Sequence, residues 1–102
     1  MAEEYPDDIK YYNYGAGTQV VHIPGRRFPA VALQGDSLSV LYSDALFFMK
    51  KGRENNDSEL YAAAENMADR IRSQLERYEE VLRHEGFDKP YAIDIHAPDD
   101  QA

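Results

Sequence analysis

The sequence predicts an α+β fold, in which a small, mainly antiparallel sheet carries two helices on one face, in the order β-β-β-α-α-β. Short segments rich in tyrosine and valine, separated by glycine and proline, make up the first third of the 102-residue chain. Two longer segments then place apolar residues at helical spacing. One further alternating segment lies near the C-terminus and completes the predicted sheet.

Four segments are expected to form strands, near residues 9–14, 18–23, 30–33 and 91–96. The first two flank the turn formers Gly15 and Gly17, which predicts a hairpin. Pro24 and Gly25 end the second strand, and an extended corner leads to the third. The last segment alternates apolar and polar side chains, as an edge strand does.

The first helix is predicted over residues 38–51, with Asp36 or Ser37 as its cap and Gly52 just past its end. Apolar residues surround most of this segment, so the helix should be largely buried. They are Leu38, Val40, Leu41, Tyr42, Ala45, Leu46, Phe47, Phe48 and Met49.

The second helix is predicted over residues 57–85, ending at Gly86, with a single apolar stripe and charged residues on its other faces, Glu79 and Arg72 among them. Its length of roughly 42 Å exceeds what a small domain needs, so one end could pack against a second copy as a homodimer. The predicted core between helices and sheet contains Leu41, Ala45, Phe48, Met67, Ile71 and Leu75.

Size and composition predict one domain spanning residues 1–102, with loose acidic tails at about 1–8 and 98–102. The chain has no cysteine, which excludes disulfides, thiolate nucleophiles and cysteine zinc sites. Its longest apolar run, residues 45–49, is far shorter than a membrane span, and the acidic N-terminus is no secretory signal. We therefore expect a cytoplasmic protein that binds no membrane.

The net charge of −8 comes largely from acids in the two ends. Nucleic-acid binding requires a basic stripe, and the sequence shows none. A more basic protein partner fits the charge, as does plain solubility from charged ends. Tyrosine beside carboxylates is typical of protein interfaces, although the tyrosines could equally serve strand packing. The candidate partner-binding residues are Tyr12, Tyr14, Asp7, Asp8, Glu76 and Glu80.

A second candidate site would bind a small anion. Arg26 and Arg27 adjoin a loop braced by proline and glycine, and Gly35 and Ser37 lie at the start of the first predicted helix. Guanidinium groups and free helix N–H groups both suit a phosphate or a carboxylate. Alternatively, the two arginines pair with the chain's own acids and the turn is structural.

The block Pro24-Gly-Arg-Arg-Phe-Pro29, followed by Gln34-Gly-Asp-Ser-Leu38, resembles the signature of a family of small bacterial proteins of unknown function. The resemblance covers residues 23–41, about a fifth of the chain. It departs from the family pattern at Ala30, where a glycine is expected. The resemblance implies a small single domain with strands before helices, and it transfers no catalytic residue.

No catalytic or cofactor motif is present. His22, Asp94 and His96 could approach one another on paired strands, but their spacing matches no metal motif. We therefore expect no metal, no cofactor and no enzymatic activity. The sequence favours a small protein-binding module, such as an immunity or antitoxin-like protein that neutralises a more basic partner. The alternatives are an anion sensor that uses the two arginines, a self-associating structural protein, and last a hydrolase without a familiar motif.

Overall fold

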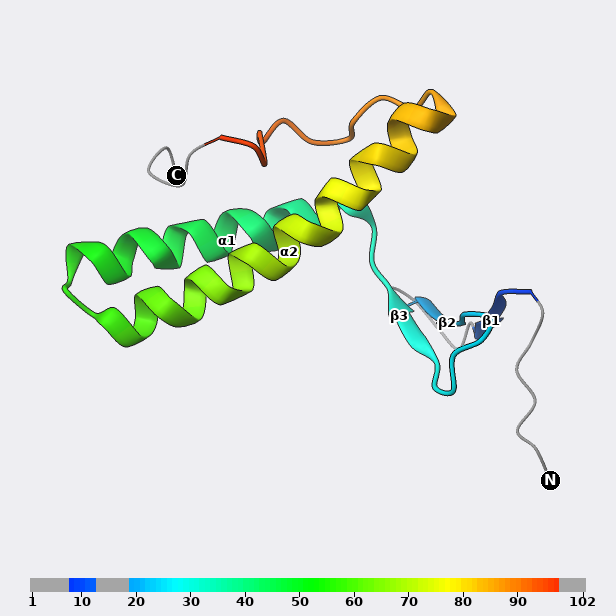
Figure 1. Ribbon diagram of the computed structural model, residues 1–102, viewed down its shortest axis with the longest axis horizontal. Helices are drawn as coiled ribbons and strands as arrows, with labels where there is room; N and C mark the ends of the chain where they lie inside the picture. Colours follow the sequence, from blue (N-terminus) through cyan, green and yellow to red (C-terminus); the bar gives the residue numbers. More distant parts are fainter. Residues whose placement is uncertain (1–7, 13–18, 98–102) are drawn as a thin grey trace. The chain divides into compact units, whose positions relative to one another are not determined.

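The computed structural model describes residues 8–12 and 19–97, which form three strands and two helices (Figure 1). The chain divides into two compact units, Met1–Leu33 with the strands and Gln34–Ala102 with the helices. This confirms an α+β protein with a small antiparallel sheet followed by two helices. The single domain, and the packing of the helices on one face of the sheet, concern how the units meet and stay predictions.

The sheet consists of β1 (Lys10–Tyr12), β2 (Gln19–His22) and β3 (Ala30–Ala32), with β2 in the centre and both pairings antiparallel. Val21 of β2 stands between Tyr11 and Ala30 in the register and is buried. Gly25 adopts a φ of 80° in the turn that leads to β3, a conformation that glycine adopts without strain. The first three predicted strands are confirmed in the part of the chain that the structure describes. The predicted turn at Gly15 and Gly17 lies outside the described residues.

Helix α1 (Gly35–Glu54) begins three residues before its predicted start and continues beyond Gly52, so a helix end at Gly52 is wrong. The predicted cap at Asp36 or Ser37 is wrong as well, because the N-cap is Gln34 and its side chain makes no capping hydrogen bond. Gly52 lies inside the helix and is buried against the start of α2. A Cβ at this position would lie 2.8 Å from the backbone nitrogen of Tyr61, so only glycine fits without a shift. The chain leaves the helix at Asn55, and Asn56 takes a left-handed φ of 53°. This glycine therefore permits close packing rather than ending the helix.

Helix α2 (Ser58–Glu85) begins and ends as the sequence predicts. Asp57 accepts a hydrogen bond from the Leu60 N–H (3.0 Å), the bond expected of an N-cap carboxylate. Gly86 ends the helix with a left-handed φ of 77°, and the Phe87 N–H donates to the Leu82 carbonyl oxygen (2.9 Å). Both signals act within a few residues, which is why the sequence alone located them.

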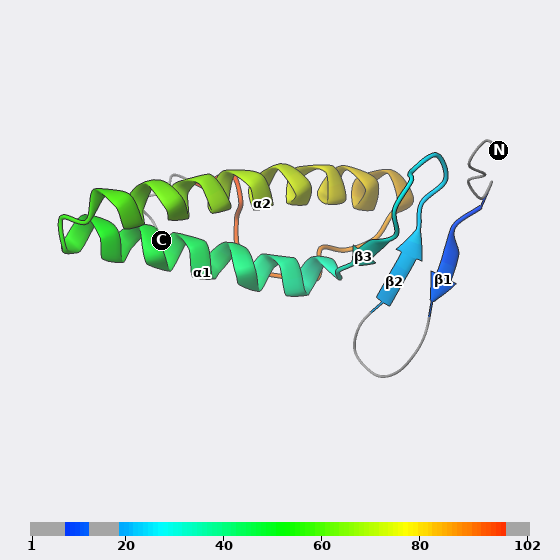
Figure 2. The same cartoon turned by 90° about the horizontal axis from the view of Figure 1, so that it is seen from below.

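The two helices form an antiparallel hairpin that contains the core of the second unit (Figures 1 and 2). Small residues on α2 let the helix axes approach closely, so that larger side chains of α1 fill the space beside them. The buried cluster consists of Tyr42, Ala45, Leu46, Met49, Ala64, Ala68, Leu75 and Ile95.

The predicted core is right for Ala45 and Leu75 but wrong for Leu41, Phe48 and Met67, which are about half exposed. Helix α2 turns its Ala64, Ala68 and Leu75 side toward α1, and this rotation puts Met67 at the flank. Ile71 packs partly against the core and also lines an open hollow beside Leu38. The buried side of α2 is therefore rotated from the predicted apolar stripe by a fraction of a helical turn.

Residues 87–97 form no strand, so the strand predicted at 91–96 is wrong. The segment turns back after α2 and runs along the helical hairpin (Figures 1 and 2). Its alternation is nevertheless real, because Tyr91, Ile93 and Ile95 pack against the helical core. Since the helices already offer an apolar surface, the extended segment buries its inner side chains there instead of at a sheet edge.

Neither α1 nor α2 is long and apolar enough to cross a membrane, within the part of the chain that the structure describes.

Candidate functional site

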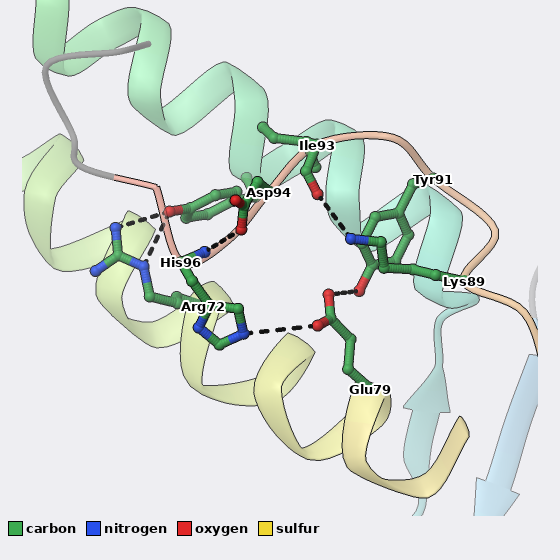
Figure 3. Close-up of polar contacts among 8 residues, drawn as sticks. Arg72, Glu79, Lys89, Tyr91, Ile93, Asp94 and His96 are labelled. Atoms are coloured by element: carbon green, nitrogen blue, oxygen red, sulfur yellow. Dashed lines mark hydrogen bonds and ion pairs between the residues drawn. The ribbon is translucent and has the colours of Figure 1, made fainter. Parts of the chain in front are cut away.

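A polar cluster lies where the C-terminal segment crosses α2 (Figure 3). Its centre is Glu79, which is only 7% exposed. The Tyr91 hydroxyl donates to Glu79 Oε2 (2.7 Å), and His96 Nε2 lies 3.7 Å from Glu79 Oε1. Burying a carboxylate without partners is costly, so these contacts explain how the fold tolerates it. Both Glu79 oxygens thus face groups of the C-terminal segment.

A second polar contact joins the two helices beside this cluster (Figure 3). Arg72 donates from Nε (2.9 Å) and from a terminal nitrogen (2.7 Å) to the hydroxyl of Tyr42, which is 1% exposed. The sequence placed Arg72 and Glu79 on solvated faces, and this assignment is wrong. One signal in the sequence could have indicated these polar contacts. Tyr42 and Tyr91 stand in apolar patterns, and a buried phenol usually needs a hydrogen-bond partner.

Glutamate, histidine and tyrosine side chains can perform acid–base chemistry, but here they bind one another. Glu79 is engaged by the Tyr91 and His96 side chains, and the Asp94 carboxylate accepts from the backbone N–H of His96 (2.9 Å). No group of three side chains suited to holding a metal ion occurs in residues 8–12 and 19–97. The geometry fits a clamp that fastens the C-terminal segment to the helices.

The clamp changes the acidity of one of its members. Burial raises the pKa of Tyr91 far above its ordinary value, and the hydrogen bond to Glu79 and the charge of Glu79 act in the same direction. The folded state therefore favours the neutral phenol. Its contribution to stability is complete below the ordinary tyrosine pKa of about 10 and is lost as the pH rises beyond it.

We expect Tyr91→Phe to lower the free energy of unfolding by about 1–2 kcal/mol at pH 7, because Glu79 loses a donor in a buried place. The difference from wild type should shrink above about pH 10, where the wild-type phenol also loses its advantage. Urea titrations at both pH values measure the two differences.

Tyr11→Phe is the matched control, since Tyr11 is 68% exposed. This variant should match wild type at both pH values. Equal stability of Tyr91→Phe and wild type at pH 7 would show that the Tyr91–Glu79 hydrogen bond does not hold the segment.

A row of exposed apolar side chains follows the side of α1 that α2 does not cover. This α1 outer face consists of Val40 (59% exposed), Leu41 (45%), Phe47 (52%) and Phe48 (46%). The two phenylalanine rings meet edge to face with centroids 5.7 Å apart. Large exposed apolar patches on small domains commonly mark interaction sites. The sequence had indicated their apolar character but predicted burial.

The predicted partner-binding residues fall in both units. In the sheet unit, Asp8 is exposed and Tyr12 is half-buried, with the Lys10 ammonium 5.2 Å from its ring centroid. Glu76 and Glu80 are exposed one turn apart on α2. Asp7 and Tyr14 lie outside the described residues. That these six residues bind a partner stays a prediction.

The predicted anion-binding residues make contacts of another kind. Arg26 is exposed in the turn before β3, and Arg27 lies over the ring of Phe28 (5.3 Å). Gly35 is buried, and a Cβ there would clash with the Tyr78 ring. The Ser37 N–H already donates to the Asp36 carboxylate (2.8 Å), which would repel an incoming anion. The anion site stays a prediction that these contacts weaken.

Comparison with known proteins gives a family but no characterised relative. No curated protein and no solved structure matches the chain. A family model matches residues 5–91, which includes the proline–arginine block and both helices. The match agrees with the resemblance to a domain of unknown function, and it covers most of the sequence. The chain therefore belongs to the family of unknown function DUF6959.

Proposed function

We propose that the protein is a non-catalytic protein-interaction module and that the α1 outer face is its main binding surface. The observation that carries this proposal is the row of four half-exposed apolar side chains on a helix whose other side is already buried. A helix that serves only its own fold would place polar residues at these positions.

The energetics support an interface at this face. Full burial of one large apolar side chain is worth about 1.5–3 kcal/mol. Each of the four side chains of the α1 outer face has about half of its surface left to bury. Together they could therefore contribute on the order of 4 kcal/mol to association. This is comparable with a small hot spot at the centre of a protein interface.

Charge suggests a second property of the partner. The chain carries a net charge of −8, and Asp8, Glu76 and Glu80 are exposed acids. Exposed acids of this kind steer basic partners. They support the further proposal of an immunity or antitoxin-like protein that neutralises a more basic protein, with steering from the acids.

Site-specific photo-cross-linking in the native host cells tests the interface. A photoreactive phenylalanine analogue at Val40 or Phe47 should give discrete protein adducts, because both side chains face outward. The matched control is Ala63, an exposed residue of α2 away from this face. Circular dichroism should first show that all three variants fold alike.

The adduct pattern decides the outcome. Adducts at Val40 and Phe47 without an adduct at Ala63 support the proposal, and mass spectrometry identifies the partner. No adduct at either α1 position, or the same adducts at all three, would overturn the α1 outer face as the interface.

A further inference from the structure

Two opposite charges flank the apolar centre of the α1 outer face. Asp44 and Lys51 lie on the same side of the helix as Val40 and Phe47, since residues four, three and four apart fall on one stripe. Within residues 8–12 and 19–97, the Asp44 carboxylate makes no hydrogen bond or ion pair. The Lys51 ammonium lies 5.4 Å from the ring centroid of Phe47 and forms an exposed pair with Glu54 (3.4 Å), in which both side chains are almost half exposed. Such pairs are weak and exchange readily.

The spacing of these charges makes the face complementary to itself. Asp44 and Lys51 are equidistant from the midpoint between Phe47 and Phe48, each about 5 Å away along the helix axis. If a second α1 packs antiparallel about a two-fold axis at that midpoint, each Asp44 comes opposite the Lys51 of the other copy. The four phenylalanine rings then meet at the centre.

We infer that the α1 outer face binds a second copy of this chain in this antiparallel arrangement, an inference that rests on the proposed function of the face as an interface. Two-fold symmetry forms both Asp44–Lys51 pairs at once, as isologous interfaces do. A parallel arrangement would place Asp44 opposite Asp44 and Lys51 opposite Lys51, which is repulsive.

The exposed apolar residues of α1 fit a dimer interface better than those of α2, the helix through which the sequence predicts a homodimer. The exposed large apolar residues of α2 in the described chain are Met67 and Val81, which stand four turns apart. On α1, four such residues adjoin one another between positions 40 and 48. A continuous apolar centre is what a dimer interface requires.

The size of the face predicts a dimer of modest affinity. An aromatic side chain buries about 150–250 Å² in full, so the half-exposed Phe47 and Phe48 offer roughly 200 Å² together. Val40 and Leu41 add a smaller area, and the sum is below the ~800 Å² per partner of a standard interface. The dimer should therefore dissociate on dilution, with a Kd above the micromolar range, because the cost of association offsets part of the apolar gain.

Sedimentation velocity of the full-length protein across a dilution series tests the inference. Wild type should move from the mass of two chains to that of one. Asp44→Lys and Lys51→Asp should each weaken the dimer by about tenfold or more, because two attractive pairs become repulsive. The double variant, with both changes, should restore wild-type association, since the pairs reform with exchanged signs. Glu65→Lys, an exposed charge reversal on α2, is the matched control and should behave as wild type.

Three results would contradict the binding of a second copy at the α1 outer face. They are a monomer at every concentration, a dimer unaffected by the single reversals, and losses that the double variant does not rescue. Photo-cross-linking at Val40 separates this failure from that of the proposed function. A monomer whose Val40 variant still cross-links to a different protein refutes the dimer alone, whereas a monomer without any adduct refutes both.

Discussion

Leu75→Ala should lower the free energy of unfolding by about 3–5 kcal/mol, the largest loss that we expect from a single change in this protein. Leu75 is completely buried, and it belongs to the cluster that joins α1, α2 and the C-terminal segment through Ile95. Alanine would remove buried methyl groups and leave a cavity that the helices cannot close without losing other contacts. Urea denaturation of variant and wild type measures the difference.

Met67→Ala is the matched control on the same helix. Met67 is 51% exposed, although the sequence placed both residues on one buried seam. Its truncation should cost less than about 1 kcal/mol. Equal losses at the two positions would mean that the hairpin packs through the seam predicted from the sequence and not through the Ala64, Ala68 and Leu75 side.

Gly52→Ala is expected to destabilise the protein by about 1–3 kcal/mol, the typical cost of overpacking. In an open helix interior the same change would stabilise by about 0.5–1 kcal/mol, because alanine is the better helix former. Here the new Cβ would lie 2.8 Å from the Tyr61 nitrogen and 2.9 Å from its Cα. Backbone atoms cannot move away as the end of a flexible side chain can. The steric clash should therefore outweigh the gain in helix propensity and make the change destabilising. Thermal unfolding followed by circular dichroism measures it.

Ser43→Ala provides the comparison on α1, because Ser43 is exposed and helical. This change should raise the stability by a few tenths of a kcal/mol through helix propensity alone. A Gly52→Ala variant as stable as Ser43→Ala would contradict the close approach of α1 to the start of α2.

Local signals were sufficient for several elements. The three N-terminal strands follow from tyrosine, valine and alanine runs between turn formers, and α2 follows from Asp57 at its start and Gly86 at its end. Each of these signals acts between residues close in the chain, through turn geometry or capping hydrogen bonds. The proline–arginine block also indicated a family of unknown function, which the family match supports.

The same kind of local reasoning failed where a distant contact decided the outcome. Gly52 looks like a helix end in the sequence, but the approach of Tyr61 makes it part of the helix interior. In the sequence Glu79 has the pattern of a surface acid, but the C-terminal segment folds back over α2 and brings Tyr91 and His96 into contact with it. Residues 91–96 alternate as a strand would, and yet the surface that receives them is helical.

The α1 outer face shows most clearly the difference between what the sequence determines and what the tertiary structure decides. The sequence by itself determined that apolar residues surround most of the α1 segment. Only the tertiary structure decided that Tyr42, Ala45 and Met49 meet α2 while Val40 and Phe47 face outward. The physical reason is that apolar character is a property of each side chain, whereas burial depends on which partner surface, distant in the chain, comes to cover it.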